Sequence, residues 1–249
     1  MLDKFKQRSH RLEHIDTGNY TAEEYEDCIS ELRFVNRWMG DAHSLKATLL
    51  REVETDHLTS FSVLDLGAGS GELLRVTATW ARQTNRQFRG VGLELSERMA
   101  ESILEESERF DEITSVRGDA LKLPFAETQF DYVICSLFTH HLLDEQVVQV
   151  LREMSRVAKR QIFVIDLHRH PVPYYFYTTL GKLVLHNRLV RHDGALSILR
   201  GFKSDELREL AQRADLQDVR VEHHFPSRLV LSAAAAVSHK KPQNAQIAA

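Results

Sequence analysis

A short apolar run that passes directly into a glycine-rich turn is the strongest constraint on how this chain folds. The run covers residues 61–66, and Gly67, Gly69 and Gly71 follow it at alternate positions. Apolar residues then recur at helical spacing over residues 70–83. Buried parallel strands are short apolar runs, and glycine permits a sharp backbone turn. The stretch therefore predicts a strand, a turn and a helix N-terminus, a combination that cradles nucleotides.

The spacing of the glycines limits which class of nucleotide ligand the turn can bind. A dinucleotide fingerprint, G-x-G-x-x-G, needs a third glycine at position 72, where this chain has Glu72. The pattern is instead G-x-G-x-G, with Asp65 two residues before it. Carboxylates at the turn and at the helix start suit a cationic ligand such as S-adenosylmethionine (SAM), which has an ammonium and a sulfonium group and no phosphate. A tight turn without a ligand is the alternative.

Composition excludes several classes of protein. The 249 residues are 43% hydrophobic with a formal net charge of −4, so we expect no nucleic-acid partner. No apolar run approaches the ~20 residues of a membrane span, which predicts no integral membrane association. The N-terminus has no segment of signal-peptide type, and Cys28 and Cys135 lie far apart, so we expect a reduced, cytoplasmic chain. Without C-x-x-C or H-E-x-x-H patterns, we expect no metal.

From residue 61 onward, predicted strands alternate with predicted helices. Repeated βα units favour a Rossmann-like, doubly wound α/β sheet whose strands are mostly parallel. The expected strands are 61–66, 88–95, 113–116, 130–136 and 160–166, with helices at 96–109, 144–157, 174–187 and 204–214. Two further strands, 219–225 and 228–235, flank Pro226 and predict a terminal hairpin.

The regions outside this alternation have other expected roles. Thr21 and Glu24 predict a capping box at the start of a first helix, and Asp41 or Ser44 would cap a second. We expect an N-terminal helical extension or lid at 1–55, acting either as packing cover or as a lid over the ligand. The main domain would cover 56–237, with a substrate insertion at about 168–202, and residues 238–249 would be a disordered tail.

Two more acidic residues fall at the carboxyl ends of predicted strands. Glu94 ends the second strand, at the distance from the glycines where nucleotide-binding folds place an acid for the ribose hydroxyls. Asp119 follows the third strand, so it should approach the same edge of the sheet as Glu94. Alternatively, Glu94 is a surface acid that caps a helix, and Asp119 belongs to a simple turn.

Four stretches together resemble the class I SAM-dependent methyltransferases. The resemblance is greatest to the small-molecule branch that includes the ubiquinone and menaquinone biosynthesis enzymes. The stretches are V-L-D-L-G-A-G-S-G (63–71), G-L-E-L-S (92–96), G-D-A-L-K-L-P-F (118–125) and F-D-Y-V-I-C-S (130–136), the last followed by His140 and His141. This resemblance implies seven strands with an antiparallel last strand, and SAM as cofactor. The cofactor-binding residues that it implies are Asp65, Gly67, Ala68, Gly69, Gly71, Glu94, Leu95, Asp119, Ala120 and Ser136.

The acceptor is less sharply indicated. His140 and His141 follow the fourth strand and are candidates for a catalytic base, with a structural role as the alternative. His168 and His170 would point to opposite sides of an extended chain, which argues against a metal. An aromatic insertion after the fifth strand favours a planar, apolar acceptor. The candidate substrate-binding residues are Trp38, His168, Tyr174, Tyr175, Tyr177 and Arg200; residues 191–194 would add polar contacts or cap turns.

The sequence thus predicts a SAM-dependent methyltransferase, a monomer or homodimer, that acts on a small, largely apolar hydroxylated or enolisable acceptor. Such an acceptor would be aromatic, quinone-like or polyketide-like, and O-methylation is slightly preferred to C-methylation. One alternative is a non-catalytic SAM-binding regulatory partner. A less favoured alternative is an NAD-dependent oxidoreductase, which the residue at position 72 argues against.

Overall fold

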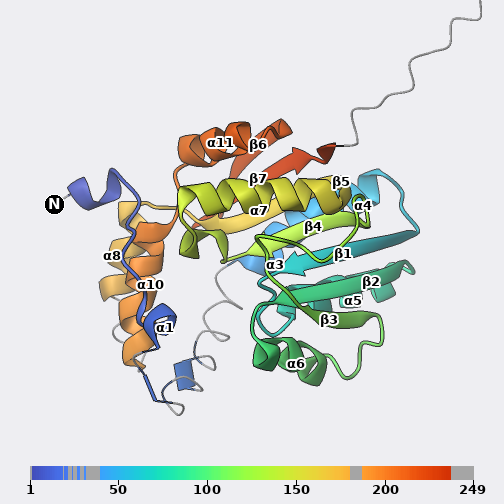
Figure 1. The fold of residues 1–249 in the computed structure, drawn as a ribbon, viewed down its shortest axis with the longest axis horizontal. Coiled ribbons are helices and arrows are strands. Elements are labelled where there is room, and N and C mark those ends of the chain that lie inside the picture. The colour runs from blue at the N-terminus through green and yellow to red at the C-terminus, as the bar shows by residue number, and fades with distance from the viewer. Residues whose placement is uncertain are drawn as a thin grey trace, which may run out of the picture.

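The computed structural model describes residues 2–18, 20–21, 24, 27–28, 31, 40–179 and 187–236. One seven-stranded sheet, in the order β3-β2-β1-β4-β5-β7-β6, forms its centre (Figure 1). The first five strands are parallel, and β7 is antiparallel to β5 and β6, which confirms the predicted topology. The strands are β1 (Ser60–Leu66), β2 (Gln87–Glu94), β3 (Ile113–Arg117), β4 (Phe130–Ser136), β5 (Ala158–Leu167), β6 (Gln217–His224) and β7 (Arg228–Ala234).

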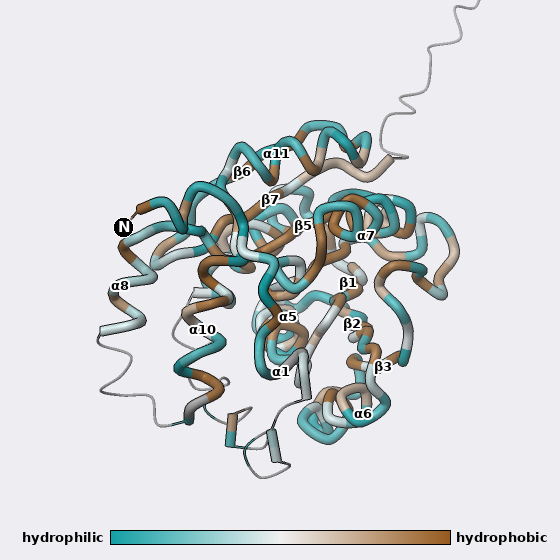
Figure 2. Tube along the Cα trace, turned by 60° about the vertical axis from the view of Figure 1, so that its left-hand side comes forward, coloured by the Kyte–Doolittle hydropathy of each residue, from teal (hydrophilic) through white to brown (hydrophobic). Residues whose placement is uncertain are grey.

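The two faces of the sheet bury separate hydrophobic cores. Successive residues of β4 alternate between them: Tyr132 and Ile134 join one core, and Val133 and Cys135 join the other. The first core lies under α3 (Asp41–Leu45), the π-helical turn η2 (Lys46–Leu50), α4 (Arg51–Thr55), α5 (Glu72–Gln83) and α6 (Glu97–Glu106). The second lies under α7 (Asp144–Val157) and α11 (Ser204–Arg213). In Figure 2 hydrophobic and hydrophilic residues alternate along α11, as expected of a helix that covers a sheet.

The order of the strands creates the place for a ligand. Winding proceeds in opposite directions from β1 toward β2 and from β1 toward β4. The helices that follow β1 and β4 therefore lie on opposite faces, which leaves a crevice at the carboxyl ends of these strands. The glycine turn after β1 and the segment after β4 both begin there. The fold thus brings the two most distinctive sequence motifs to one edge of the sheet.

A second group of helices lies apart from those that cover the sheet. Helices α1 (His14–Thr17), α8 (Pro171–Thr179) and α10 (Arg188–Arg200) lie together at the left of Figure 1. The turn η1 (Asp3–Phe5) precedes α1 in the chain, and the single turn η3 (Thr139–His141) contacts α10 in space. A backbone hydrogen bond of 3.0 Å from Ser9 to Leu199 joins the N-terminal segment to α10.

Several local expectations need correction. Asp41 does not cap its helix, because α3 has Gly40 (φ 94°) at its N-cap, and the Asp41 carboxylate binds Arg228 instead. Residues 191–194 lie inside α10 rather than at turns. The capping box is confirmed, since Thr21 and Glu24 exchange side-chain hydrogen bonds of 3.0 and 3.1 Å. Part of the expected lid packs into the core through Leu45, Leu49, Leu50 and Val53.

Some expectations concern residues outside the described part of the chain. These are Trp38, most of the first N-terminal helix, the end of the helix expected at 174–187, and the tail at 238–249. Within the described ranges, no helix has the length and hydrophobicity needed to cross a bilayer.

Candidate functional site

The glycine turn between β1 and α5 leaves room for a ligand at one position. Gly67, Gly69 and Gly71 all have positive φ, of 63°, 58° and 78°, which side chains disfavour. A Cβ on Gly67 would lie 2.8 Å from the Phe138 ring, whereas a Cβ on Gly69 would meet nothing within 4 Å. Close packing therefore explains the first glycine. Gly69 instead faces open space, where another molecule could approach the backbone.

Two carboxylates lie around this turn, and burial raises the pKa of both. Asp65 is 2% exposed, and its Oδ1 has no hydrogen-bond partner among the described residues. Burial, and secondly the charge of Glu94, raises the Asp65 pKa well above its usual range. Glu94 accepts a 2.5 Å hydrogen bond from the Gly69 N–H, which partly offsets the effect of its own burial on its pKa. A cationic ligand would relieve this excess of buried negative charge.

The loop after β3 meets the end of β2 as predicted. The Gly118 N–H donates to the Glu94 carbonyl at 2.9 Å, and Asp119 is the next residue along the chain. Asp119 is exposed, and its Oδ1 accepts from the Leu121 N–H at 2.8 Å. Ala120 is buried in the core. Leu95 is 70% exposed, which is unusual for leucine and leaves an apolar surface beside Glu94.

Ser136, at the end of β4, belongs to a buried polar chain that the sequence did not predict. Its hydroxyl donates to Asp41 Oδ1 at 3.3 Å. Asp41 in turn accepts hydrogen bonds of 2.6 and 3.1 Å from Arg228 of β7, whose side chain is 1% exposed. Asp41 and Arg228 are 187 residues apart, so no local pattern could have paired them. The N-terminal helix α3 is thereby fastened to the candidate site.

His140 is a poor candidate for a catalytic base. It is 3% exposed, and its Nδ1 lies 2.7 Å from Asp166 Oδ1. Asp166 also accepts from the Thr139 hydroxyl at 2.5 Å and from the His140 N–H at 3.1 Å. Burial would raise the Asp166 pKa, but the charge and hydrogen bond of His140, with that of Thr139, bring it below its usual range. His140 is thus held by its contact with Asp166, whereas His141 is only half-buried.

Arg200, in α10, holds the backbone of His140 and His141 in place. Its guanidinium donates to the His140 and His141 carbonyls at 3.0 and 2.6 Å and to the Arg11 carbonyl at 2.5 Å. Arg200 Nε also lies 3.8 Å from Glu13, which is 4.0 Å from His140 Nε2. With Arg200 only 3% exposed, its contacts in the described residues are those of a structural clamp.

His168 lies beside other histidines at the end of β5. Its ring stacks on His170, with centroids 5.2 Å apart, and meets His223 edge-on at 4.6 Å. The expectation that His168 and His170 point to opposite sides is therefore wrong, because side chains two residues apart lie on the same side of an extended chain. Burial, and then the neighbouring histidines, lowers the His168 pKa to about 4. His168 is consequently neutral at pH 7.

The aromatic insertion packs against the N-terminal segment. Tyr174 and Tyr175 lie edge-on to Phe5, at 5.4 and 6.2 Å, and the Lys4 ammonium lies 3.7 Å from the Tyr174 centroid. The Tyr177 hydroxyl donates to the Val190 carbonyl of α10. The tyrosines thus join η1, α8 and α10.

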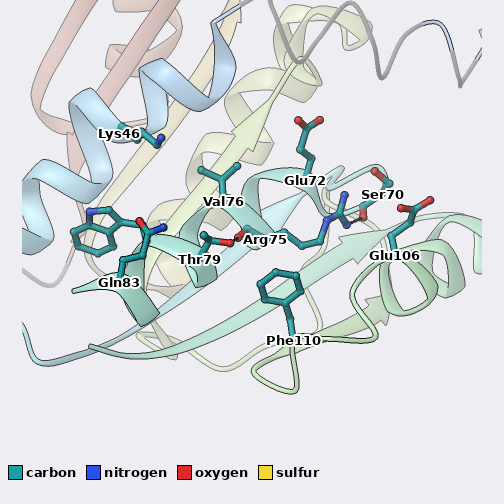
Figure 3. A pocket seen from close by; sticks show the side chains of 10 residues that line it. Lys46, Ser70, Glu72, Arg75, Val76, Thr79, Gln83, Glu106 and Phe110 are labelled. Carbon is teal, nitrogen blue, oxygen red and sulfur yellow. Dashed lines mark hydrogen bonds between the residues drawn. The ribbon is translucent and has the colours of Figure 1, made fainter. Parts of the chain in front are cut away.

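A cavity of about 580 Å³ lies on the outer side of α5 (Figure 3). Its walls carry charges of both signs, from Lys46, Arg75, Glu72 and Glu106. None of the predicted cofactor-binding residues lines it, although Ser70 of the glycine turn does.

Comparisons with known proteins agree with this geometry. Residues 63–161 match the family model described as "Methyltransferase domain". The chain is 33% identical over 96 residues to a 2-phytyl-1,4-naphtoquinone methyltransferase of Thermosynechococcus vestitus, covering 39% of this chain and 40% of that protein. It is 27% identical over 177 residues to a demethylmenaquinone methyltransferase of Shouchella clausii, covering 66% of this chain and 73% of that protein.

Solved structures show the same fold at low identity. The magnesium protoporphyrin IX methyltransferase of Synechocystis PCC 6803, with bound SAH, has a TM-score of 0.57 at 16% identity, over 82% of this chain and 88% of that one. A putative O-methyltransferase from Nostoc punctiforme has a TM-score of 0.59 at 16% identity, over 83% of this chain and 59% of that one. The sequence match over residues 63–161, the strand order and the glycine turn together support a class I SAM-dependent methyltransferase domain in this part of the chain.

Proposed function

We propose that the chain binds SAM at the glycine turn and transfers its methyl group to a small acceptor. The observation that carries this proposal is a pair of carboxylates, the buried Asp65 and the half-buried Glu94, around a turn that is open at Gly69. When bound, SAM supplies an electrophilic methyl group on a positively charged sulfur. A cation is the ligand that two carboxylates with raised pKa values would favour.

Each part of the site would hold a different part of the cofactor. The turn Gly67–Gly71, with Asp65 beneath it, would hold the amino-acid end. Glu94 would accept hydrogen bonds from the ribose if its carboxylate turned away from the Gly69 N–H. Asp119 and Ala120 would face the adenine, with Leu95 and Ser136 completing the walls.

We infer that the acceptor is a small, largely apolar hydroxylated or enolisable molecule, aromatic or quinone-like. Two relatives of this chain are named for naphthoquinone and menaquinone methylation, which supports this class. The exposed Leu95 supplies apolar surface near the site. O-methylation remains our slight preference over C-methylation. The candidates for the wall of the acceptor site remain Tyr174, Tyr175, Tyr177 and His168. Arg200 remains a candidate that acts on the acceptor through η3.

For acceptors that must lose a proton, His141 is the better candidate base. The ion pair with Asp166 engages His140 Nδ1, and burial shields the rest of the ring. The His141 ring lies 4.2 Å from the His140 ring, and Arg200 holds the His141 carbonyl at 2.6 Å. His140, Asp166 and Arg200 would then act as positioning residues.

The test has two parts. SAM is titrated into the protein by calorimetry, and methyl transfer is measured with a panel of hydroxylated naphthoquinones and phenols. We expect Glu94→Ala to weaken SAM binding by about tenfold or more, since a charge-assisted contact is worth about 1.5–3 kcal/mol. His141→Ala should retain SAM binding and lose turnover. Glu97→Ala, at an exposed position of α6, is the matched control.

Failure to bind millimolar SAM, or full binding by the Glu94→Ala variant, would overturn the cofactor assignment. SAM binding without transfer to any acceptor would favour the non-catalytic alternative. Equal turnover of His141→Ala and the unaltered chain would reject His141 as the base.

A further inference from the structure

Three side chains from opposite ends of the sequence meet between α1 and α10, away from the glycine turn. His14 Nδ1 lies 2.8 Å from His192 Nδ1 and 3.1 Å from Asp193 Oδ1. His192 Nδ1 lies 2.9 Å from the same oxygen. These three atoms thus form a nearly equilateral triangle. His14 and His192 are 178 residues apart, which explains why no sequence motif indicates the cluster.

Hydrogen bonds alone do not satisfy this triangle. Each imidazole Nδ1 carries at most one proton, and a carboxylate oxygen carries none. If both nitrogens are protonated, both donate to Asp193, and two N–H groups face each other across 2.8 Å. If only one is protonated, the other nitrogen and Asp193 Oδ1 oppose lone pairs across about 3 Å. In either state one edge of the triangle is repulsive.

A cation bound to all three atoms removes this conflict, because every lone pair then points to it. Metal–nitrogen and metal–oxygen bonds of about 2.0–2.2 Å place adjacent ligand atoms about 3.4 Å apart in a tetrahedral site and about 3.0 Å apart in an octahedral one. The three observed separations are 2.8, 2.9 and 3.1 Å. Imidazole nitrogens with a carboxylate are also a ligand set preferred by divalent transition metals.

We propose that His14, His192 and Asp193 form a binding site for a divalent transition-metal ion such as Zn²⁺, which fastens the N-terminal segment to α10. Asp193 Oδ1 also accepts from the His14 backbone N–H at 3.0 Å, a bond that orients the carboxylate. The site replaces the expectation, made from sequence motifs alone, that the chain has no metal. It is independent of the SAM site.

The site is open enough for an ion to enter. The side chains of His14 and His192 are 31% and 43% exposed, whereas that of Asp193 is 9% exposed. Both histidines line a surface cavity of about 400 Å³, together with Arg11, Leu12 and Thr17. Water or a further ligand could complete the coordination from this side. Because Arg11 adds positive charge to the cavity, the affinity should be lower than that of a closed structural zinc centre.

The experiment titrates ZnCl₂ into the tag-free, full-length chain after treatment with EDTA and its removal, with binding followed by calorimetry. We expect one ion per chain. His192→Ala and Asp193→Asn should each weaken binding by about tenfold or more, since loss of even an outer-shell partner typically costs about 10–100-fold. The Asn variant keeps the size of the side chain and an oxygen for the His14 N–H. His10→Ala is the matched control, because His10 is exposed in the same segment and lines a different cavity.

A second readout guards against a variant that fails to fold. Co²⁺ added to the unaltered chain should produce visible absorption of a nitrogen- and oxygen-ligated ion, which Zn²⁺ should displace. Absence of binding at millimolar Zn²⁺ would overturn the proposal. So would unchanged affinity in folded His192→Ala, or an equal loss in His10→Ala. SAM titration of the same samples, with and without Zn²⁺, reports separately on the proposed function.

Discussion

Two buried aspartates, Asp65 in β1 and Asp166 in β5, differ in what surrounds them. Asp166 is neutralised inside the protein by His140, and its pKa is lowered despite complete burial. Asp65 has no such cation among its described neighbours; burial, with the charge of Glu94 second, raises its pKa. A buried carboxylate without a partner is costly to folding. Asp65 costs stability in the unliganded protein, so ligand binding explains its presence better than folding does.

Replacement of Asp65 by Asn should stabilise the unliganded protein and weaken SAM binding. The folded-state pKa of Asp65 is raised, so ionisation of Asp65 destabilises the fold as the pH rises above the pKa of the unfolded chain. At pH 8 the Asn variant should gain on the order of 1 kcal/mol in unfolding free energy. Its affinity for SAM should fall by about tenfold. Urea unfolding at pH 5 and pH 8, with calorimetry, measures both effects.

The gain in stability should be larger at pH 8 than at pH 5, where wild-type Asp65 is less ionised. A variant that lost stability equally at both pH values would contradict this account of the carboxylate.

At the element scale, one ion pair fastens α3 to the sheet. Arg228 donates two hydrogen bonds to the Asp41 carboxylate in a nearly dry environment, and Ser136 donates a third. A Cβ on the adjacent Gly40 would lie 2.7 Å from the Phe225 carbonyl, so the start of α3 fits closely against the loop before β7. The N-terminal helix is thus a fixed wall of the candidate site.

Asp41→Ala should destabilise the protein by about 3–5 kcal/mol, because it leaves the Arg228 charge buried without its partner. Glu112→Ala is the control, since it breaks the Arg82–Glu112 pair, whose Arg82 side chain is 50% exposed. Such surface pairs contribute about 0–1 kcal/mol. Denaturant unfolding of both variants at pH 7 makes the comparison. A similar small cost for both would show that the Asp41–Arg228 pair contributes little to holding α3.

Other elements were predicted well or poorly for identifiable reasons. The strands and helices of the core follow from periodic apolar residues, which report local burial. Helix α10 was not predicted at all: no helix was expected between residues 187 and 204, and Asp193 followed by Gly194 resembles a turn. Gly194 lies inside the helix since its missing side chain leaves space for Tyr177, whose hydroxyl would lie 2.1 Å from a Cβ at that position. The packing of α8 on α10, rather than backbone freedom, requires this glycine.

At the scale of the whole molecule, the N-terminal segment, η3, β5 and α10 converge on one buried cluster of charges. Its members are Glu13, His140, Asp166 and Arg200, each no more than 3% exposed. Charges taken from four parts of the chain neutralise one another there. The cluster therefore links the ends of the sequence to the segment that carries His141.

This cluster should make the protein sensitive to acid. The Asp166 pKa is lower in the folded than in the unfolded chain, so its contribution to stability is present above the unfolded value of about 4. It is lost as the pH falls from there through the lower folded-state pKa, and we expect a loss of about 1–3 kcal/mol. Unfolding free energies measured from pH 6 to pH 2 test this.

Asp166→Asn provides the comparison. The variant should be less stable at pH 6 and should lose less of its remaining stability on acidification. Parallel pH profiles for the variant and the unaltered chain would mean that other carboxylates dominate acid unfolding.

The sequence by itself determined the βα alternation, the glycine turn and the places of Glu94 and Asp119, because these depend on consecutive residues or on the shared edge of a parallel sheet. The tertiary structure decided the rest. It paired Asp41 with Arg228, enclosed His140 between Asp166 and Glu13, and brought His14 to His192 and Asp193. Side chains so far apart along the chain meet only because hydrophobic packing of the elements fixes where each one ends, and no local pattern records that outcome.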